Sequence, residues 1–501
     1  MGGEAAGDLR GWRGDEVGDS RGVFGCPEHP RMVEPVRTDD VRREAMFRTI
    51  AMPLNVKWGL SGLSMTLGSG DFPTDRHGWA ELLPERQASQ PLEGDHRVAW
   101  TVIGAGVTGL ASARRLAELH PDREVLLLEA RLLGQGATGR SSGLAVAVSH
   151  FSGGFETDQM ESYRRVNRIN QAGLDLLRVQ AAKFAVDCHW KEDGFFHAAA
   201  DQAAIRECSH FLRYLEAMEI AHTPLDAEAL NARLGIGLYR IGVHVDKGAL
   251  MQPAALVRGL ADGLPANVRV HERSPVLRIE KGVPLTLTLQ RGEVRTDNLV
   301  LAVNYEAPKL GFLRRYLVGS TLSGSFTRVL ADEEFASLGS EKEWGLLSLH
   351  SGGATVRLTA DRRLCLRNAA EYNGGALLSD TQLARRQSIH RAGFEKRFPQ
   401  LAHVPFECAW SGVEGISRNS TNFFGRQGDN IYLAGGYNGS GLSRGTAFGT
   451  ALAEYAGGGH SPLIDDCLAA APGAWIPPRP FLDLGALLTV RSRFRGVGLD
   501  R

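Results

Sequence analysis

The stretch TVIGAGVTGLASARRLAEL, residues 101–119, decides the fold of this 501-residue chain. A short apolar run leads into the pattern Gly-x-Gly-x-x-Gly, and apolar residues then recur at helical spacing. In such a strand–turn–helix unit, Gly104 permits the tight turn, Gly106 lets the backbone approach a pyrophosphate, and Gly109 lets the helix lie close to the strand. The start of the helix then offers free N–H groups and a partial positive charge to the phosphates.

The glycine pattern alone is weak support, because 60 of the 501 residues are glycine and chance also produces it. A second match, GQGATG at residues 134–139, is not followed by a helical pattern. The first match is followed by another buried strand, EVLLLEA at residues 124–130, which has Glu129 near its end. A carboxylate there accepts hydrogen bonds from both ribose hydroxyls and repels a 2′-phosphate, so the sequence favours FAD or NAD over NADP.

The second match belongs to a loop, GQGATGRSSG at residues 134–143, which also carries Arg140, Ser141 and Ser142. Exposed N–H donors in such a loop can hold another part of an extended cofactor, such as the pyrophosphate or the flavin of FAD. An ordinary surface loop is the alternative. In both cases the loop is not a second copy of the strand–turn–helix unit.

A third strand–glycine loop–helix unit lies near the C-terminal end, NIYLAGGYNGSGLSRGTAFGTALAEYAGG at residues 430–458. Small residues in its helix, among them Gly445 and Gly449, predict close packing against a neighbour. Segments of a nucleotide-binding fold therefore occur at both ends of the chain, with other material between them. This order predicts a cofactor domain and a substrate domain between which the chain crosses repeatedly.

The intervening segments predict further elements. Residues 50–97 look like a loop-rich arm, and residues 158–183 have helical periodicity. CHWKEDGFFHAAA, residues 188–200, predicts a strand pair that turns at Asp193-Gly194. Between residues 268 and 303 the chain alternates in short β-runs: VRVHE, PVLRIE, LTLTLQ, EVRT and NLVLAVN.

Composition excludes several classes of protein. The chain has 57 acidic and 57 basic residues, which argues against a chain-wide footprint for nucleic acid or anionic membrane, though not against a local patch. No apolar run is long enough to span a bilayer, and no signal-peptide pattern opens the chain. The six cysteines form no Cys-x-x-Cys pair, so we expect reduced thiols in a cytoplasmic protein and no metal site. A covalent flavin link through one of them stays open.

Taken together, the motifs resemble the FAD-dependent D-amino-acid oxidase superfamily, above all its glycine/sarcosine oxidase group and γ-glutamylputrescine-oxidase-like branch. The first glycine turn, VLLLEA and GATGRSSG carry the resemblance at one end, and WSGVEGISRNSTNFFGRQGDNIYLAGGYNGSGL, residues 410–442, carries it at the other. MQPAALVRGLA, SPVLRIE, NLVLAVN and GATVRLTADRRLCLRNAAEY resemble family segments in the same order. GRSSGLAVAVSHFSGG departs from the family because it lacks the usual Asn-Gly-Gly.

The resemblance implies an α/β fold in which a Rossmann-like FAD-binding domain is interleaved with an α+β substrate domain built on an antiparallel-rich sheet. The expected segments are an N-terminal extension, partly disordered, over residues 1–75; FAD-binding segments 96–185, 246–310 and 406–465; substrate-domain segments 186–245 and 311–405; and a C-terminal tail 466–501.

The resemblance also implies that the cofactor is FAD, held mostly by the three glycine loops. The backbone of Val276 is expected near the adenine, and the loop at residues 436–442 near the pyrimidine side of the flavin, where a positive dipole stabilises the reduced ring. The expected contacts are Gly104, Gly106, Val107, Thr108, Gly109, Glu129, Ala130, Arg131, Thr138, Gly139, Arg140, Ser141, Val276, Ala302, Asn304, Gly436, Tyr437, Asn438, Gly439, Gly441 and Leu442.

By the same resemblance the substrate is a small amine or amino acid that presents a neutral nitrogen and an adjacent C–H over flavin N5. Hydride transfer gives an imine, water hydrolyses the imine, and the electrons pass to oxygen or another acceptor. Such a reaction needs neither a protein nucleophile nor a metal.

Candidate substrate-site residues are only weakly specified by the sequence. Arg357 and Arg367 lie on expected substrate-domain strands, where an arginine can clamp a carboxylate with two hydrogen bonds. Tyr372 lies beside them, His150 follows the second glycine loop, and Trp410 precedes the last motif. Each has a structural alternative: a solvated strand residue, a structural histidine or core packing.

Other functions remain open at this point. A flavin-dependent monooxygenase would need a nicotinamide site, and the sequence has no second strand–Gly-x-Gly-x-x-Gly–helix unit. A non-catalytic flavin-binding subunit would keep its flavin oxidised in the presence of amines. A plain NAD dehydrogenase leaves the loop at residues 436–442 unexplained.

Overall fold

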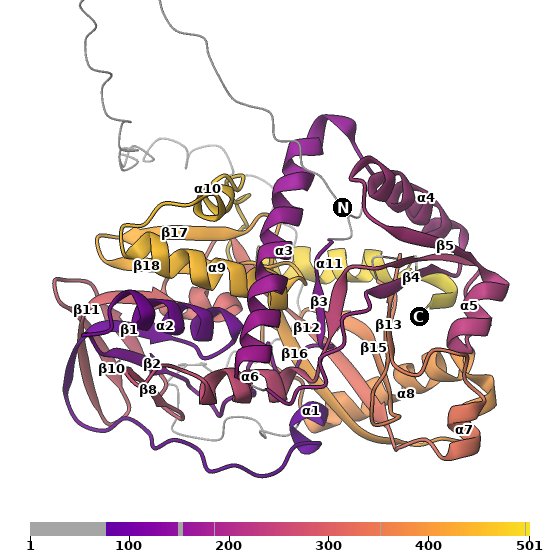
Figure 1. The fold of residues 1–501 in the computed structure, drawn as a ribbon, viewed down its shortest axis with the longest axis horizontal. Coiled ribbons are helices and arrows are strands. Elements are labelled where there is room, and N and C mark those ends of the chain that lie inside the picture. Colours follow the sequence, from indigo (N-terminus) through magenta and orange to yellow (C-terminus); the bar gives the residue numbers. More distant parts are fainter. Residues whose placement is uncertain (1–76, 149–153, 185, 351, 496, 501) are drawn as a thin grey trace, which may run out of the picture. The chain divides into compact units, whose positions relative to one another are not determined.

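The computed structural model describes residues 77–148, 154–184, 186–350, 352–495 and 497–500. Two eight-stranded sheets and one two-stranded sheet make up the β-structure of these residues (Figure 1). One large sheet is mostly parallel and the other mostly antiparallel, which confirms the predicted fold class. The expected N-terminal extension, residues 1–75, lies outside the described residues.

The first sheet contains the predicted Rossmann-like unit. Its five central strands run parallel in the order β18-β11-β1-β2-β8. Every residue of β2 is buried, as expected for a parallel strand covered on both faces. The strands are β1 (His96–Ile103), β2 (Val125–Leu128), β8 (Val268–His271), β9 (Arg278–Glu280), β10 (Leu285–Leu289), β11 (Gly292–Leu301), β17 (Phe423–Gly428) and β18 (Ile431–Gly435).

The second sheet has the order β16-β12-β15-β14-β13-β4-β6-β5, and only β13 and β4 pair in parallel. Its strands are β4 (Phe195–Ala199), β5 (His222–Asp226), β6 (Ile241–Val245), β12 (Leu317–Thr327), β13 (Trp344–Ser348), β14 (Thr355–Leu358), β15 (Leu364–Glu371) and β16 (Phe406–Ser417). β16 lies inside the segment 406–465 that the sequence assigned to the FAD-binding domain. β16 pairs with β12 along its length and so belongs to the second sheet.

Two predictions of local strand structure are wrong. EVRT and NLVLAVN are not separate strands, since β1 pairs in register with residues 294–301 and joins both runs into β11. The strand pair predicted at residues 188–200 is only β4, and Lys191 makes just an isolated bridge to Leu250. β4 pairs instead with β6 and β13, so long-range pairing replaces the expected local hairpin.

Helices cover both sheets. The two-stranded sheet consists of β3 (Leu144–Val146) and β7 (Gly248–Leu250), which lie where the chain passes from one large sheet to the other. The helix predicted at residues 158–183 is α3, preceded by one 3-10 turn over Thr157–Gln159. The helices are α1 (Gly78–Glu81), α2 (Val107–Leu119), α3 (Met160–Lys183), α4 (Gln202–Ala217), α5 (Ala227–Leu234), α6 (Pro253–Asp262), α7 (Asp332–Ala336), α8 (Asp380–Arg397), α9 (Gly441–Ala456), α10 (Pro462–Leu468) and α11 (Phe481–Arg495).

Close contact between α2 and α9 brings the two ends of the chain's nucleotide fold together. A Cβ added at Gly449 would lie 2.2 Å from the carbonyl oxygen of Thr108, and one at Gly445 would lie 2.8 Å from the Thr108 Oγ1. Only glycine fits at this distance, which confirms the close packing that the small residues of α9 predict.

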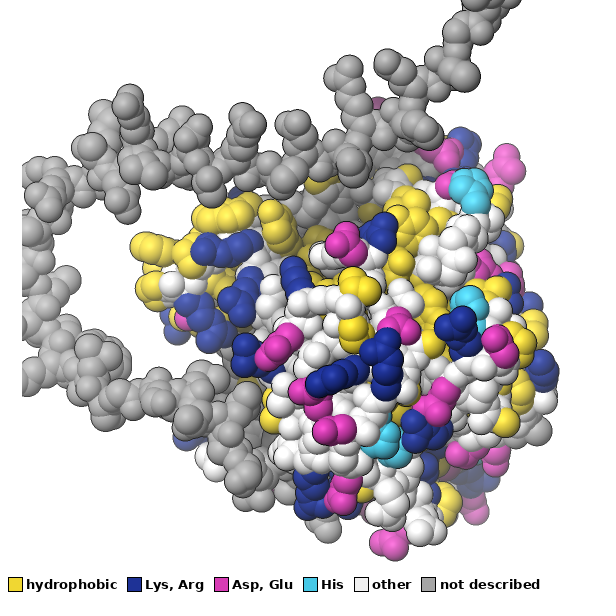
Figure 2. Space-filling view, turned by 90° about the vertical axis from the view of Figure 1, so that its left-hand side faces the viewer, with side chains coloured by type: hydrophobic (Ala, Val, Ile, Leu, Met, Phe, Trp, Pro, Cys, Tyr) yellow, Lys and Arg dark blue, Asp and Glu magenta, His cyan; other side chains and the backbone are white. Residues whose placement is uncertain are grey.

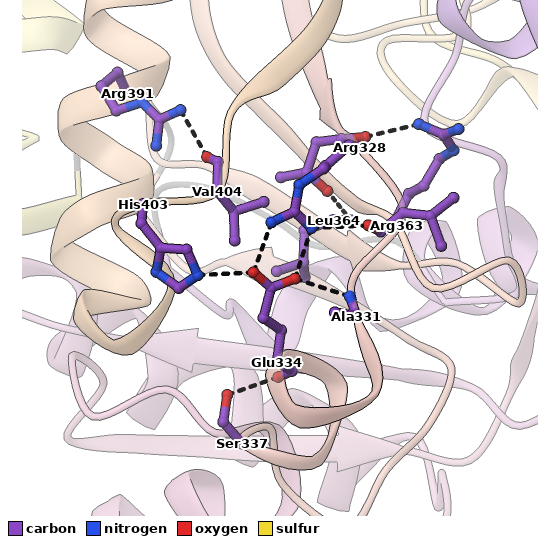
Figure 3. A network of polar contacts seen from close by, with 11 residues as sticks. Arg328, Ala331, Glu334, Ser337, Arg363, Leu364, Arg391, His403 and Val404 are labelled. Atoms are coloured by element: carbon purple, nitrogen blue, oxygen red, sulfur yellow. Dashed lines mark hydrogen bonds and ion pairs between the residues drawn. The ribbon is translucent and has the colours of Figure 1, made fainter.

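A polar network holds α7 against the end of the second sheet (Figure 3). The Glu334 carboxylate accepts two hydrogen bonds of 2.6 Å from Arg328, one of 2.8 Å from the Ala331 N–H, and one of 2.7 Å from His403. The Arg328 guanidinium lowers the pKa of Glu334 to about 2. The carboxylate is therefore charged at any working pH and fixes the loop after β12.

Candidate active site

The turn between β1 and α2 is built so that only glycines fit. Gly104 has φ +98°, and a Cβ there would lie 2.7 Å from the Ala302 carbonyl oxygen. A Cβ at Gly109 would lie 1.7 Å from the Gly104 carbonyl oxygen. α2 begins after Gly106 without a side-chain cap among the described residues, whereas Asp201 caps α4 and Ser379 caps α8. The first turn of α2 therefore has N–H groups to offer to an anion.

Glu129 lies at the end of β2 beside this turn. Its carboxylate accepts a 2.8 Å hydrogen bond from the Ala105 N–H on one oxygen and a 2.9 Å bond from the Arg131 N–H on the other. Burial raises the pKa of Glu129, and these two N–H groups oppose the rise. A carboxylate has about four acceptor positions. Two are thus left for further donors, the number that a ribose diol supplies.

The second glycine loop folds back on the first. A Cβ at Gly139 would lie 1.8 Å from the Gly134 carbonyl oxygen, and the Val107 N–H donates to the Thr138 Oγ1 at 3.4 Å. Arg140 was predicted to contact the cofactor. Its buried guanidinium donates to the carbonyl oxygens of Gln135 at 2.8 Å and Ser411 at 3.1 Å, so it also fastens the loop to β16.

The third glycine loop, before α9, contacts the first turn of α2, although the two segments are far apart in the sequence. The Tyr437 hydroxyl lies 2.9 Å from the Thr108 Oγ1, where the two share a hydrogen bond. The Asn304 Oδ1 accepts the Gly436 N–H at 2.9 Å, and the Asn438 Oδ1 accepts the Ser417 N–H at 2.9 Å. The two asparagine side chains therefore hold the loop in place, and α9 starts with no side-chain cap from the described residues.

β16, an edge strand of the second sheet, contacts both the second and the third glycine loop. The Trp410 Nε1–H donates to the Arg140 carbonyl oxygen at 3.1 Å, and a Cβ at Gly412 would lie 3.3 Å from the Arg140 Cβ. Two residues further on, the Glu414 Oε2 lies 3.6 Å from the Cβ position of Gly439. The second and third glycine loops thus lie against one face of the second sheet.

Arg367 lies on this same face. It is in register with Gly324 on β12 and with Thr355 on β14, and Gly324 is in register with Trp410. Residues opposite each other, and residues two or four apart on one strand, share a face of a sheet. The Arg367 guanidinium donates to the Thr355 hydroxyl. Burial lowers the pKa of Arg367, and the negative charge of Glu414 opposes this.

The other predicted substrate residues have different surroundings. Arg357 is buried and donates to the carbonyl oxygens of Ser142 at 3.2 Å and Gly143 at 3.3 Å, so its guanidinium holds the second loop. The Tyr372 hydroxyl donates to Asp483 of α11 at 2.6 Å. Trp410 packs on Phe326 with ring centroids 4.9 Å apart. His150 lies outside the described residues.

The sequence did not identify Glu414, and it predicted the arm before β1 without the contacts that this arm makes with the second loop. In WSGVEGIS, alternation along a strand places Gly412 and Glu414 on one face of that strand. The sequence does not show whether this face is turned toward the glycine loops or away from them. In the arm, His77 Nε2 lies 3.1 Å from the Gly134 carbonyl oxygen, and burial lowers the pKa of His77 to about 3. The neutral imidazole ring therefore donates its N–H to the second glycine loop and helps to hold that loop in place.

Glu272 ties the arm to the same loop. Its carboxylate is fully buried and accepts hydrogen bonds from Arg86 at 2.8 Å, from the Ser89 N–H at 2.7 Å and from the Leu133 N–H at 2.6 Å. Burial alone would raise the pKa of Glu272, but the hydrogen bonds from these donors outweigh burial, so the pKa lies below the ordinary 4.5.

Glu272→Gln should therefore destabilise the protein by about 1–3 kcal/mol near neutral pH, because an amide cannot satisfy three donors as a carboxylate does. A carboxyl whose pKa is lowered on folding contributes stability above its unfolded pKa and loses it as the pH falls through the folded value. Denaturant unfolding at a series of pH values should show the difference between wild type and variant in full above about pH 5.5 and shrinking below pH 4.5. A constant difference across this range would contradict the assignment.

Comparison with known proteins decides the family. Residues 99–455 match the DAO family, described as FAD dependent oxidoreductase. The chain belongs to this family. This DAO-family member is thus an FAD-dependent oxidoreductase, and both the predicted recognition and the predicted cofactor are confirmed. The uncapped starts of α2 and α9, the glycine-only turns and the Glu129 carboxylate fit FAD.

Several relatives support the branch that the sequence indicated. γ-Glutamylputrescine oxidoreductase of Escherichia coli is 28% identical over 365 residues, which are 70% of this chain and 82% of that protein. Glycine oxidase from Geobacillus kaustophilus has a TM-score of 0.62 at 16% identity and covers 73% of this chain and 96% of its own. L-Proline dehydrogenase from P. horikoshii has a TM-score of 0.59 at 16% identity, with coverages of 74% and 96%. At these identities the two structures show a shared fold.

Two further findings concern the environment of the DAO-family chain. No helix in the described part of the chain is both long and apolar enough to cross a bilayer. The five described cysteines are all free thiols, and only Cys408 among them is not fully buried. Cys26 lies outside the described residues.

Proposed function

We propose that this DAO-family oxidoreductase oxidises the C–N bond of an amine or amino acid to an imine, which water then hydrolyses. FAD, when bound, accepts the hydride from the carbon beside the substrate nitrogen. The observation that carries the proposal is that the second and third glycine loops lie against the face of β16 that carries Glu414, and that Arg367 lies on the same face of the sheet. Reoxidation by oxygen or another acceptor belongs to the same proposal.

The chain's own groups have distinct tasks in this proposal. The first turn of α2 offers N–H groups to the pyrophosphate, and Glu129 accepts the ribose hydroxyls. The loop at residues 436–440 and the start of α9 direct a positive dipole at the pyrimidine edge of the flavin, which favours the reduced ring. We retain the remaining predicted FAD contacts as part of this proposal.

Arg367 and Glu414 are proposed to recognise the substrate. Glycine and proline, named in two of the structural relatives, carry a carboxylate close to the amine. An arginine binds such a carboxylate through paired hydrogen bonds. The Glu414 carboxylate would attract the ammonium group and accept its proton, which leaves the neutral nitrogen that hydride loss requires.

Anaerobic titration of the purified holoenzyme with a panel of amines and amino acids tests the reaction. We expect one or more of them to bleach the flavin absorbance near 450 nm and to yield the imine-derived carbonyl compound. Bleaching by NAD(P)H alone would favour a monooxygenase. A flavin that no amine reduces would favour a non-catalytic subunit, and either result would overturn the proposal.

Arg367→Met tests the substrate site. With the charge-assisted bond lost, kcat/KM for a carboxylate-bearing substrate should fall by about tenfold to a hundredfold, mainly through KM. An amine without a carboxylate should be affected much less. Arg362→Met is the control, because Arg362 lies on the neighbouring β14–β15 turn and pairs with the exposed Asp332. Equal losses for both kinds of substrate would show that Arg367 acts elsewhere.

The free thiols support the further proposal that the enzyme works in the cytoplasm, where cysteines stay reduced.

A further inference from the structure

An exposed apolar surface lies on α11 and the segment before it. Trp475 is 53% exposed, and four large apolar side chains of α11 are more than 40% exposed: Phe481 66%, Leu484 59%, Leu487 41% and Leu488 57%. We call these five side chains the α11 patch. They lie C-terminal to residues 99–455, so the patch is an addition to the part of the chain that matches the family.

The fold does not require the α11 patch. α11 turns its other side toward β15, where the side chains of Leu482, Ala486 and Val490 are half-buried. Asp483 fixes the helix by accepting a hydrogen bond from Tyr372 and pairing with Arg479 at 3.2 Å. α11 is therefore apolar on both sides, and a helix of that kind is normally covered on both sides. The outer side lacks such cover from the described residues.

Basic residues lie beside the α11 patch. Arg491 is exposed one helical turn after Leu487 and Leu488, and the one acid of residues 469–495, Asp483, is paired with Arg479. From a neighbouring segment, the Arg315 guanidinium lies 5.9 Å from the Trp475 ring centroid, and Arg418 donates to the Trp475 carbonyl oxygen at 3.2 Å. Figure 2 shows hydrophobic side chains next to Lys and Arg side chains on a projecting part of the surface at the left.

We propose that the α11 patch docks on the surface of an anionic lipid bilayer. Leucine, phenylalanine and tryptophan side chains enter the boundary between headgroups and acyl chains, and arginines at the rim pair with lipid phosphates. A second copy of this chain fits less well, because a two-fold interface would set the same arginines against each other. The zero net charge of the whole chain does not oppose this, since the basic residues are concentrated locally.

Vesicle flotation of the full-length, flavin-loaded protein tests the proposal. The protein should float with phosphatidylcholine vesicles that contain about one third phosphatidylglycerol, much less with phosphatidylcholine alone, and less again at high salt. Leu484→Asp/Leu488→Asp should weaken the partition by roughly tenfold or more, since two apolar contacts become charged. Arg491→Glu should weaken it on the anionic vesicles only.

Val179→Asp is the matched control, because Val179 is 60% exposed on α3 and lies outside the α11 patch. It should leave flotation unchanged. All variants should keep the wild-type flavin content and melting temperature, which separates loss of docking from loss of folding. No flotation of the wild type, or equal losses in the control, would overturn the proposal. So would a wild-type dimer in light scattering that Leu484→Asp/Leu488→Asp converts to a monomer, since the patch would then bind a second copy.

Discussion

Gly109→Ala is expected to purify with less than about a tenth of the wild-type flavin. The added methyl carbon would lie 1.7 Å from the Gly104 carbonyl oxygen, and no rotamer change can separate them, because the backbone fixes the positions of both atoms. Relief requires either opening the turn after β1 or lifting α2 from the sheet. Each of these moves the N–H groups that face the pyrophosphate and weakens the contact between α2 and α9.

Gly136→Ala provides the control for this substitution. Gly136 also belongs to a Gly-x-Gly-x-x-Gly match, but no atom lies within 4 Å of the position of its added Cβ. The ratio of absorbance at 450 nm to that at 280 nm, measured after purification, gives the flavin content. The shift in melting temperature on adding FAD gives a second reading. A Gly109→Ala protein with wild-type flavin content would contradict the role of this turn.

The glycine turn could be predicted because its parts are local. The strand, the three glycines, the helix and Glu129 lie within about thirty residues, so each supports the others in the sequence itself. Close packing of α9 against another element could also be predicted, since Gly445 and Gly449 leave room for a close neighbour. The identity of that neighbour, α2, depends on a contact over more than three hundred residues and was not predicted.

The sequence could not predict which strand residues lie on the sheet face that contacts the glycine loops. Periodicity shows which residues of a strand share a face, but the direction of that face depends on pairing with distant strands. Arg357 and Arg367 are only ten residues apart, yet Arg357 donates to carbonyl oxygens of the second loop, whereas Arg367 donates to the Thr355 hydroxyl. β16 joins the second sheet for the same reason: its partner β12 lies far back in the chain.

The C-terminal tail contains the second feature with a large expected effect. Asp500 and Arg397 form an ion pair whose side chains are both fully buried. Arg397 also donates to the Asp500 carbonyl oxygen at 2.7 Å, and the Tyr239 hydroxyl donates to the Asp500 Oδ1 at 3.1 Å. The penultimate residue of the chain is thus buried between α8 and β13, the strand that carries Ser348.

Asp500→Ala should lower the free energy of unfolding by about 3–5 kcal/mol, because it leaves the Arg397 guanidinium buried without its counter-charge. A chain that ends at Gly498 should lose a similar amount, since it lacks the same carboxylate. The exposed pair Arg362–Asp332 provides the control, and Asp332→Ala should cost less than about 1 kcal/mol. Denaturant unfolding of the flavin-loaded proteins measures all three. If Asp500→Ala costs no more than Asp332→Ala, the Arg397–Asp500 pair does not hold the C-terminal residues in place.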